Sequence, residues 1–97
     1  MPSNVPRSDT TKKREQLQRR EEELKHAIRS EVSHAKLNRA VENLKDARLS
    51  LLKAELYWAE DERIRGRNVD GRVAKIQDES RRWQERSVED ILHDYMT

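Results

Sequence analysis

The stretch from Thr10 to Arg65 contains neither glycine nor proline. These two residues are the strongest local breakers of regular structure. Their absence permits one unbroken helix of about 55 residues, roughly 80 Å long at 1.5 Å per residue. Ala, Glu, Lys, Leu and Arg together supply 49 of the 97 residues, a share that is typical of long helices and coiled coils. The sequence therefore predicts an all-α protein.

The strongest turn signal lies at residues 66–71. Both glycines of the chain, Gly66 and Gly71, fall in this segment. A glycine directly after a helix is a common C-terminal cap, because it adopts a positive φ without penalty. We therefore predict a long helix–turn–helix hairpin with coiled-coil packing, oligomeric, whose second helix runs from about Asp70 to Met96. The predicted organisation is a flexible leader (1–9), a projecting helical arm (10–36), and a hairpin with the oligomerisation core (37–97).

The apolar pattern of the first helix changes sides along its length. A thin stripe on the arm is predicted to bind a partner protein: Leu17, Leu24, Ile28 and Val32. A heptad then follows on the opposite side: Leu37, Ala40, Leu44, Ala47, Leu51, Ala54 and Trp58. Further apolar residues widen this arc to more than half of the circumference, so the helix must touch more than one neighbour. We therefore predict that the heptad is the core of a homo-oligomer, most simply a dimer.

The second helix has an amphipathic face that should pack back across the turn. Its packing residues are Val73, Ile76, Trp83, Ile91 and Tyr95. A turn centred between Asn68 and Val69 sets residue i opposite residue 137 − i. This register places Trp83 opposite Ala54, so that a large ring would meet a small side chain.

The 21 basic and 19 acidic residues nearly balance, but two basic clusters stand out as candidate phosphate contacts. These are Lys12, Lys13 and Arg14 on the arm, and Arg63, Arg65, Arg67 and Arg72 around the turn. One interpretation is a solvated helix surface with ion pairs between residues one turn apart. The other is binding of duplex RNA or DNA through phosphates.

Two Glu-x-x-His motifs, Glu23 to His26 and Glu31 to His34, have the spacing of metal ligands on one helix. On a single helix they would point in different directions, and glutamate is so frequent here that chance matches are expected. We predict no metal, no cofactor and no catalytic residue. The chain also has no N-terminal apolar segment and no apolar run of about 18 residues. These features favour a cytoplasmic or nuclear protein that is neither secreted nor transmembrane.

One stretch of the second helix resembles a known family. The pattern Ile76-x-x-Glu79-x-x-Arg82-Trp83-Gln84, followed by Val88-x-Asp90-Ile91, looks like the last helix of sorting-nexin BAR domains. The resemblance covers under a fifth of the chain, and the family has three long helices where this sequence predicts two. It would imply a dimer that binds curved anionic membranes.

We expect the chain to be a non-enzymatic interaction or scaffold protein that dimerises and binds another protein. A helical dimer that binds nucleic acid is the first alternative. A BAR-like module on a membrane surface is the second, although the short extent of the resemblance disfavours a membrane partner. Salt dependence separates the first two, because binding through several phosphates weakens steeply as salt rises.

Overall fold

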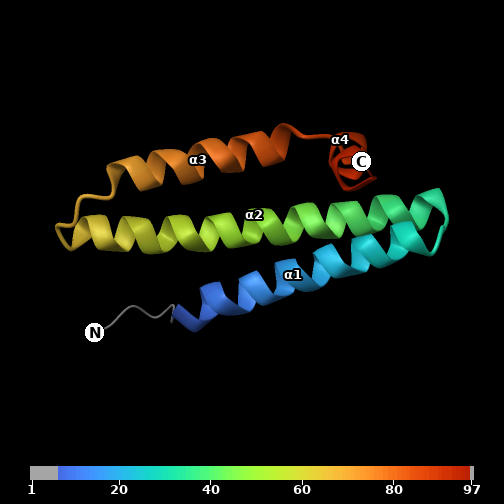
Figure 1. Cartoon of the computed structure of the whole chain (residues 1–97). Coiled ribbons are helices and arrows are strands. Elements are labelled where there is room, and N and C mark those ends of the chain that lie inside the picture. The colour runs from blue at the N-terminus through green and yellow to red at the C-terminus, as the bar shows by residue number, and fades with distance from the viewer. Residues whose placement is uncertain (1–6, 97) are drawn as a thin grey trace.

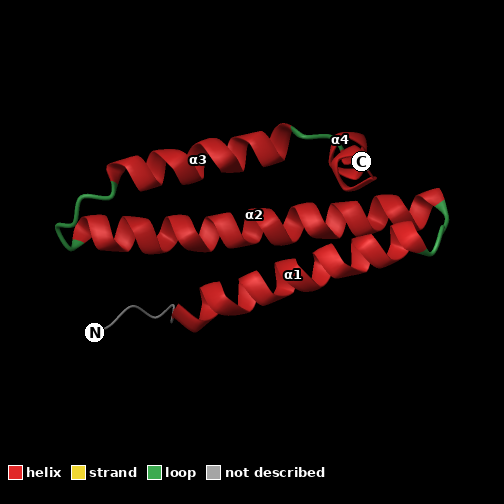
Figure 2. Cartoon of the chain, viewed as in Figure 1, coloured by secondary structure: helices red, strands yellow, loops and turns green. Residues whose placement is uncertain are grey.

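The computed structural model describes residues 7–96, which form four α-helices and no strand (Figure 1, Figure 2). They are α1 (Arg7–Arg29), α2 (His34–Ile64), α3 (Asp70–Glu85) and α4 (Val88–Met96). The central helix is α2. Helices α1 and α3 run antiparallel to it on either side, and α4 crosses near its N-terminal end, where Figure 1 shows α4 almost end-on. The molecule measures 50 × 23 × 18 Å. The all-α prediction is confirmed.

The predicted single helix from Thr10 to Arg65 is wrong, because the chain reverses at residues 30–33. Three backbone bonds end α1: Ser30 donates to the carbonyl of His26, Glu31 to Ile28, and Val32 to Ala27. The bond from Glu31 spans three residues and the bond from Val32 spans five. Together these two bonds define a Schellman motif. This motif needs a left-handed residue, and Glu31 supplies it with φ of 50°. Ser33 then caps α2 by accepting the Lys36 N–H at 3.4 Å.

Replacing Glu31 by glycine should raise the free energy of unfolding by about 1 kcal/mol. A left-handed conformation costs roughly 1–2 kcal/mol for a residue with a Cβ and almost nothing for glycine. In an unbroken helix the same change would instead destabilise by about 1 kcal/mol relative to alanine. Urea denaturation of the Glu31→Gly and Glu31→Ala variants measures this difference. A Glu31→Gly variant less stable than Glu31→Ala would contradict a reversal at this residue.

The predicted turn at residues 66–71 is confirmed, since α2 ends at Ile64 and α3 begins at Asp70. Gly66 has φ of 87° and donates to the Arg63 carbonyl, while Arg67 donates to that of Glu62. This is the same Schellman pattern as at the end of α1, here with glycine at the left-handed position. The two chain reversals of the molecule are therefore built alike.

The second helix of the hairpin is not continuous, because α3 ends at Glu85 and α4 begins at Val88. Arg86 is extended, with φ of −70° and ψ of 132°. The Lys45 ammonium donates to the carbonyls of Gln84 at 3.0 Å and Arg86 at 2.8 Å. A cation suits the carbonyl end of a helix. Ser87 accepts the N–H of Asp90 at 3.1 Å and so caps α4.

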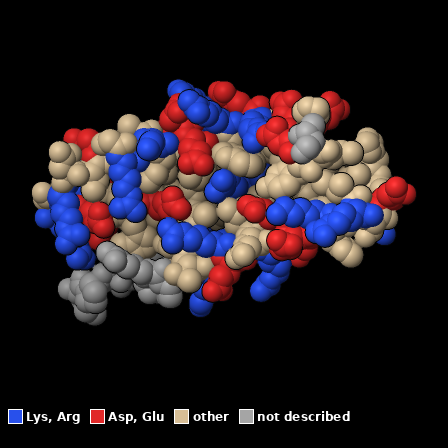
Figure 3. Space-filling view, viewed as in Figure 1, with Lys and Arg blue, Asp and Glu red and all other residues tan. Residues whose placement is uncertain are grey.

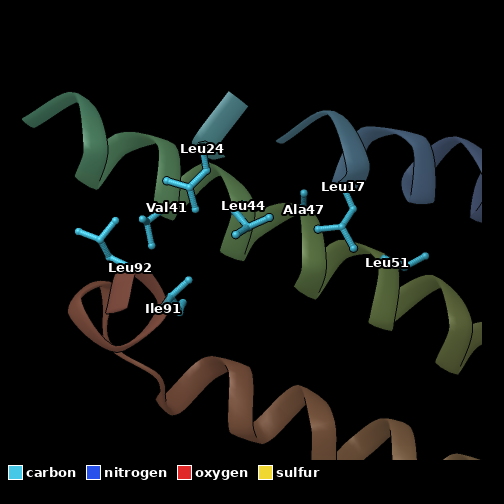
Figure 4. Close-up of a cluster of buried hydrophobic side chains, with 8 residues drawn as sticks. All are labelled: Leu17, Leu24, Val41, Leu44, Ala47, Leu51, Ile91 and Leu92. Carbon is cyan, nitrogen blue, oxygen red and sulfur yellow. The ribbon is translucent and has the colours of Figure 1, made fainter. Parts of the chain in front are cut away.

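The break lets α4 join a core that α1 shares with α2 (Figure 4). Figure 4 shows apolar side chains of the three helices converging, from Leu17 and Leu24 of α1 to Ile91 and Leu92 of α4. Leu24, Leu44, Ile91 and Val41 are the largest side chains that are fully buried. The prediction that residues 10–36 project as an arm is therefore wrong. The stripe predicted to bind a partner packs on the chain's own α2.

The predicted register of α3 on α2 is displaced. The ring of Trp83 lies 5.3 Å from the guanidinium carbon of Arg48, whereas the 137 − i rule places Trp83 opposite Ala54. Trp83 therefore lies nearer to the N-terminal end of α2 than the rule predicts. Trp83 packs against the core in Figure 4 and also against a second cluster of buried residues, Leu52, Ala59, Val73 and Ile76. It lies where the two clusters meet because α3 ends there, where Lys45 caps its carbonyls.

The boundary of the predicted leader also moves. Residues 7–9 belong to α1, and the rest of the leader, residues 1–6, lies outside the described residues. Thr10, where the predicted arm begins, is therefore inside the first helix.

Candidate functional site

The residues predicted to form an oligomer core lie inside a single chain. Leu44, Ala47, Leu51 and Ala54 are buried, Leu37 and Ala40 pack on the core of Figure 4, and Trp58 is half-buried. The wide apolar arc of α2 does have two neighbours, as predicted. They are α1 and the α3–α4 segment of the same chain, so the arc no longer requires a second chain. Self-association stays a prediction that needs another surface.

The predicted packing residues of the second helix divide between the two clusters. Val73 and Ile76 are buried against Leu52 and Ala59, whereas Ile91 is buried with Leu44 in the core of Figure 4. Tyr95 packs on the edge of that core. Of the arm residues, Leu17 and Leu24 are buried there, Ile28 packs on it, and Val32 is half-buried in the loop after α1.

An aromatic and charged cluster joins α2, α3 and α4. The guanidinium carbons of Arg48 and Arg86 lie 5.3 and 5.0 Å from the centre of the Trp83 ring, within the range of cation–π attraction. Arg86 also pairs with Asp94 of α4, and Arg48 lies 3.9 Å from Glu79 of α3. Each arginine thus bridges helices, which is a structural role. These contacts hold the Trp83 ring beside Arg48 and Arg86.

Burial raises the pKa of the Tyr95 phenol above its ordinary value, and the Glu21 carboxylate raises it further, against opposing effects of Arg48 and Arg86. A phenol that ionises less readily in the folded chain stabilises the fold below the pKa of the unfolded chain, about 10. That contribution is lost as the pH rises through the folded pKa. In a Tyr57→Phe variant, absorbance titration should give Tyr95 a higher midpoint in the folded chain than in urea. Equal midpoints would contradict its burial.

The fold brings the two predicted basic clusters to the same end of the molecule. Because α1 runs antiparallel to α2, its first turns lie beside the end of α2, close to the turn. Several of the candidate phosphate contacts are paired with acids: Arg14 with Glu55 at 3.9 Å, Arg63 with Asp70 at 3.3 Å, Arg65 with Asp61 at 3.3 Å, and Arg72 with Glu62 at 3.7 Å. Lys13 donates to the Ser50 hydroxyl at 2.8 Å, and Lys12 and Arg67 are exposed. Figure 3 accordingly shows both signs of charge interspersed on the viewed face.

Helices α1 and α3 lie on the same half of α2 and leave a furrow between them. On a helical wheel, the α2 residues that share the core with α1 are roughly 100° from those that pack on α3. Near the N-terminal end of α2, the furrow is closed by α4, whose Ile91 and Leu92 pack among Leu24, Val41 and Leu44. Helix α4 has 9 residues and α2 has 31, so the closed part is short. At the other end, no helix among residues 7–96 covers the furrow.

The open part of the furrow, here called the open groove, is the best candidate for a functional site. It has a volume of about 270 Å³ and is lined by Thr10, Thr11 and Arg14 of α1, Glu55, Trp58 and Glu62 of α2, and Arg72 of α3. Glu55 and Glu62 lie two helical turns apart on its floor, and Trp58 lies between them. Arg14 reaches Glu55 from one wall, and Arg72 reaches Glu62 from the other.

The dimensions and chemistry of the open groove favour a large partner over a small molecule. Ligand pockets for small molecules are usually enclosed and measure about 300–1,000 Å³. The open groove is smaller than this range, and four of its seven lining residues are charged. Within residues 7–96, no three His, Asp or Glu side chains lie together as a metal site requires. The two Glu-x-x-His motifs are separated, because His26 lies on α1 and His34 begins α2.

The sequence analysis placed Trp58 in the predicted oligomer core, and Arg14 and Arg72 among the candidate phosphate contacts. It missed Glu55 and Glu62. Their spacing of seven residues places them on one face of α2, between the surfaces that face α1 and α3. That spacing is a usable signal only once α1 is known to fold back.

Comparisons with family models, with curated proteins and with solved structures find no match. The stretch that resembles the last helix of sorting-nexin BAR domains is interrupted at Arg86 and Ser87, where α3 gives way to α4. The long continuous helix that the resemblance implies is therefore not present in it. No helix of the described part is both long and apolar enough to cross a membrane.

Proposed function

We propose that the chain is a non-enzymatic interaction protein that binds a helix of another protein in the open groove. One observation carries the proposal: α4 closes the furrow between α1 and α3 at one end only. A helix laid in the other end would pack on α1, α2 and α3 together. It would complete a bundle of four helices, an arrangement in which each helix buries one face against its neighbours.

The side chains of the open groove suit a protein partner. Tryptophan and arginine are enriched among the residues that contribute most to protein interfaces, and here Trp58 lies between two arginine–glutamate pairs. Surface pairs of this kind contribute only about 0–1 kcal/mol each, so a partner can displace them at little cost. The partner helix we propose therefore presents small residues towards Trp58 and charges of both signs towards the walls.

Photocrosslinking in cells tests this proposal. Benzoylphenylalanine replaces Thr11, which is exposed at the rim of the open groove, or Gln77, an exposed residue of α3 outside it, as the control. We expect a discrete protein adduct from position 11 and none from position 77. Arg14→Glu and Arg72→Glu together reverse the charge of the arginine on each wall of the open groove. This double variant should reduce the yield of the adduct by at least about tenfold, which corresponds to a loss of roughly 1.4 kcal/mol of binding free energy. Equal adducts from both positions, or an adduct unaffected by the reversal, would contradict a groove-bound partner.

Nucleic acid is the second candidate, because the fold gathers the two basic clusters at one end. It has less support, since Arg14, Arg63, Arg65 and Arg72 are each paired with a carboxylate. The same crosslinking separates the two candidates. An adduct that disappears on nuclease treatment, together with affinity that falls steeply with salt, would favour nucleic acid and contradict the protein partner.

A cytoplasmic or nuclear location stays a prediction. It is consistent with the proposed role but does not support it.

A further inference from the structure

The face of α2 that is turned away from the open groove carries an exposed stripe. Its members are Lys53, Tyr57, Glu60 and Ile64, whose spacings of four, three and four residues place them in one line along the helix. Ile64 is 85% exposed and Tyr57 is 45% exposed, and both are large apolar side chains. We call these four residues the back stripe. It lies outside the surfaces of α2 that α1, α3 and α4 cover.

We propose that the back stripe is the docking surface for a second copy of this chain, with the two α2 helices antiparallel. The charge pattern identifies this occupant. A two-fold axis at Tyr57 sets residue i level with residue 114 − i of the second copy. Lys53 then lies within one residue, about 1.5 Å of rise, of being level with Glu60 of the second copy. Each interface thus contains the Lys53–Glu60 pair twice, as two-fold symmetry requires.

The same register also brings the two apolar members of the back stripe, Tyr57 and Ile64, into the interface. Tyr57 meets Tyr57 of the second copy at the axis, and Ile64 lies level with Ser50 of the second copy, beside the Lys13 side chain that donates to the Ser50 hydroxyl. A parallel arrangement would set Lys53 beside Lys53 and Glu60 beside Glu60, which like charges disfavour. Neither Lys53 nor Glu60 forms an ion pair within the described part of the chain. Their charges are therefore not already neutralised by a neighbouring residue of that part.

The dimer should be weak. A contact centred on one face of one helix buries less than about 1,200 Å², which is the range of transient complexes. We therefore expect a dissociation constant between about 1 µM and 1 mM. This dimer differs from the one predicted from the heptad, because the heptad is buried within the chain. It is also independent of the open groove on the opposite side of α2.

Sedimentation equilibrium from about 10 µM to 1 mM tests the proposal on the full chain, over the range set by the expected affinity. The apparent mass should rise from 11.6 kDa towards twice that value. Lys53→Glu and Glu60→Lys should each weaken the dimer by about fivefold or more, since each removes two pairs of roughly 0.5 kcal/mol and adds repulsion. The double variant should restore association, because it exchanges the charges across the interface. Lys75→Glu, at an exposed site on α3, is the matched control.

The three substitutions are at exposed positions, and circular dichroism checks that each variant keeps its helicity. Three results would overturn the proposal. They are a mass of 11.6 kDa throughout, a dimer that weakens equally with Lys75→Glu, and a double variant no stronger than either single variant.

Discussion

Replacing Leu24 by alanine is expected to lower the free energy of unfolding by about 2–5 kcal/mol. Leu24 is fully buried where α1 meets α2 and α4, and the truncation removes apolar contacts and leaves a cavity. A chain of this length has a total stability of roughly 5–15 kcal/mol, so the loss is a large fraction of it. Urea denaturation followed by circular dichroism measures the change.

The matched control is Lys25→Ala, the adjacent position on α1 with an exposed side chain. Its effect should stay within about 0.5 kcal/mol, as is usual for surface substitutions. An unpacked α1 would give the two variants the same small effect. That outcome would contradict the burial of α1 against its own chain.

Trp83→Ala should destabilise the protein by about 3–5 kcal/mol. The ring packs against both buried clusters and lies beside Arg48 and Arg86, so its loss affects the contacts of three helices at once. Hydrogen exchange should show the largest loss of protection in α4, because Arg86, which pairs with Asp94, loses its stacking partner. Thermal denaturation gives the overall loss.

Tyr57→Ala serves as the comparison, because Tyr57 is also aromatic but 45% exposed. It should cost markedly less than Trp83→Ala. Equal losses for the two variants would mean that Trp83 does not join the two clusters.

The two chain reversals show what the sequence could and could not predict. The turn at Gly66 was predictable, because glycine at a left-handed position is a recognisable cap. The reversal at Glu31 uses the same hydrogen bonds but puts a glutamate in that conformation, and so leaves no glycine to find. Two weaker signals were present. Ser33 is a good N-cap residue, and the apolar stripe changes sides at Leu37, where a new helix has already begun.

The burial of the heptad shows a second limit. Periodicity predicted correctly which face of α2 is covered and that it needs two neighbours. It could not tell whether those neighbours come from the same chain, because an apolar face is buried equally well by either. The answer depended on the reversal at Glu31, which brings Leu17 and Leu24 back onto Leu44 and Leu51.

The break between α3 and α4 depends on contacts between distant residues. Lys45 caps α3 from 39 and 41 residues away, and only Ser87 is a local signal. The open groove likewise combines three segments that are far apart in the sequence, represented by Arg14, Trp58 and Arg72. Its residues could be noted individually, but their convergence follows from the path of the chain.

The most direct test of this fold is a crosslink between positions 13 and 50, in a protein that has no cysteine of its own. Lys13 and Ser50 are joined by a hydrogen bond of 2.8 Å between α1 and α2, whereas 37 residues of unbroken helix would separate them by roughly 55 Å. Because the long Lys13 side chain makes this bond, a Lys13→Cys, Ser50→Cys variant is treated with a bifunctional maleimide whose spacer is about as long as that side chain. The reaction uses an equimolar mixture of tagged and untagged chains. The fold predicts crosslinking within each chain and no tagged–untagged product, while crosslinks formed only between chains would contradict it.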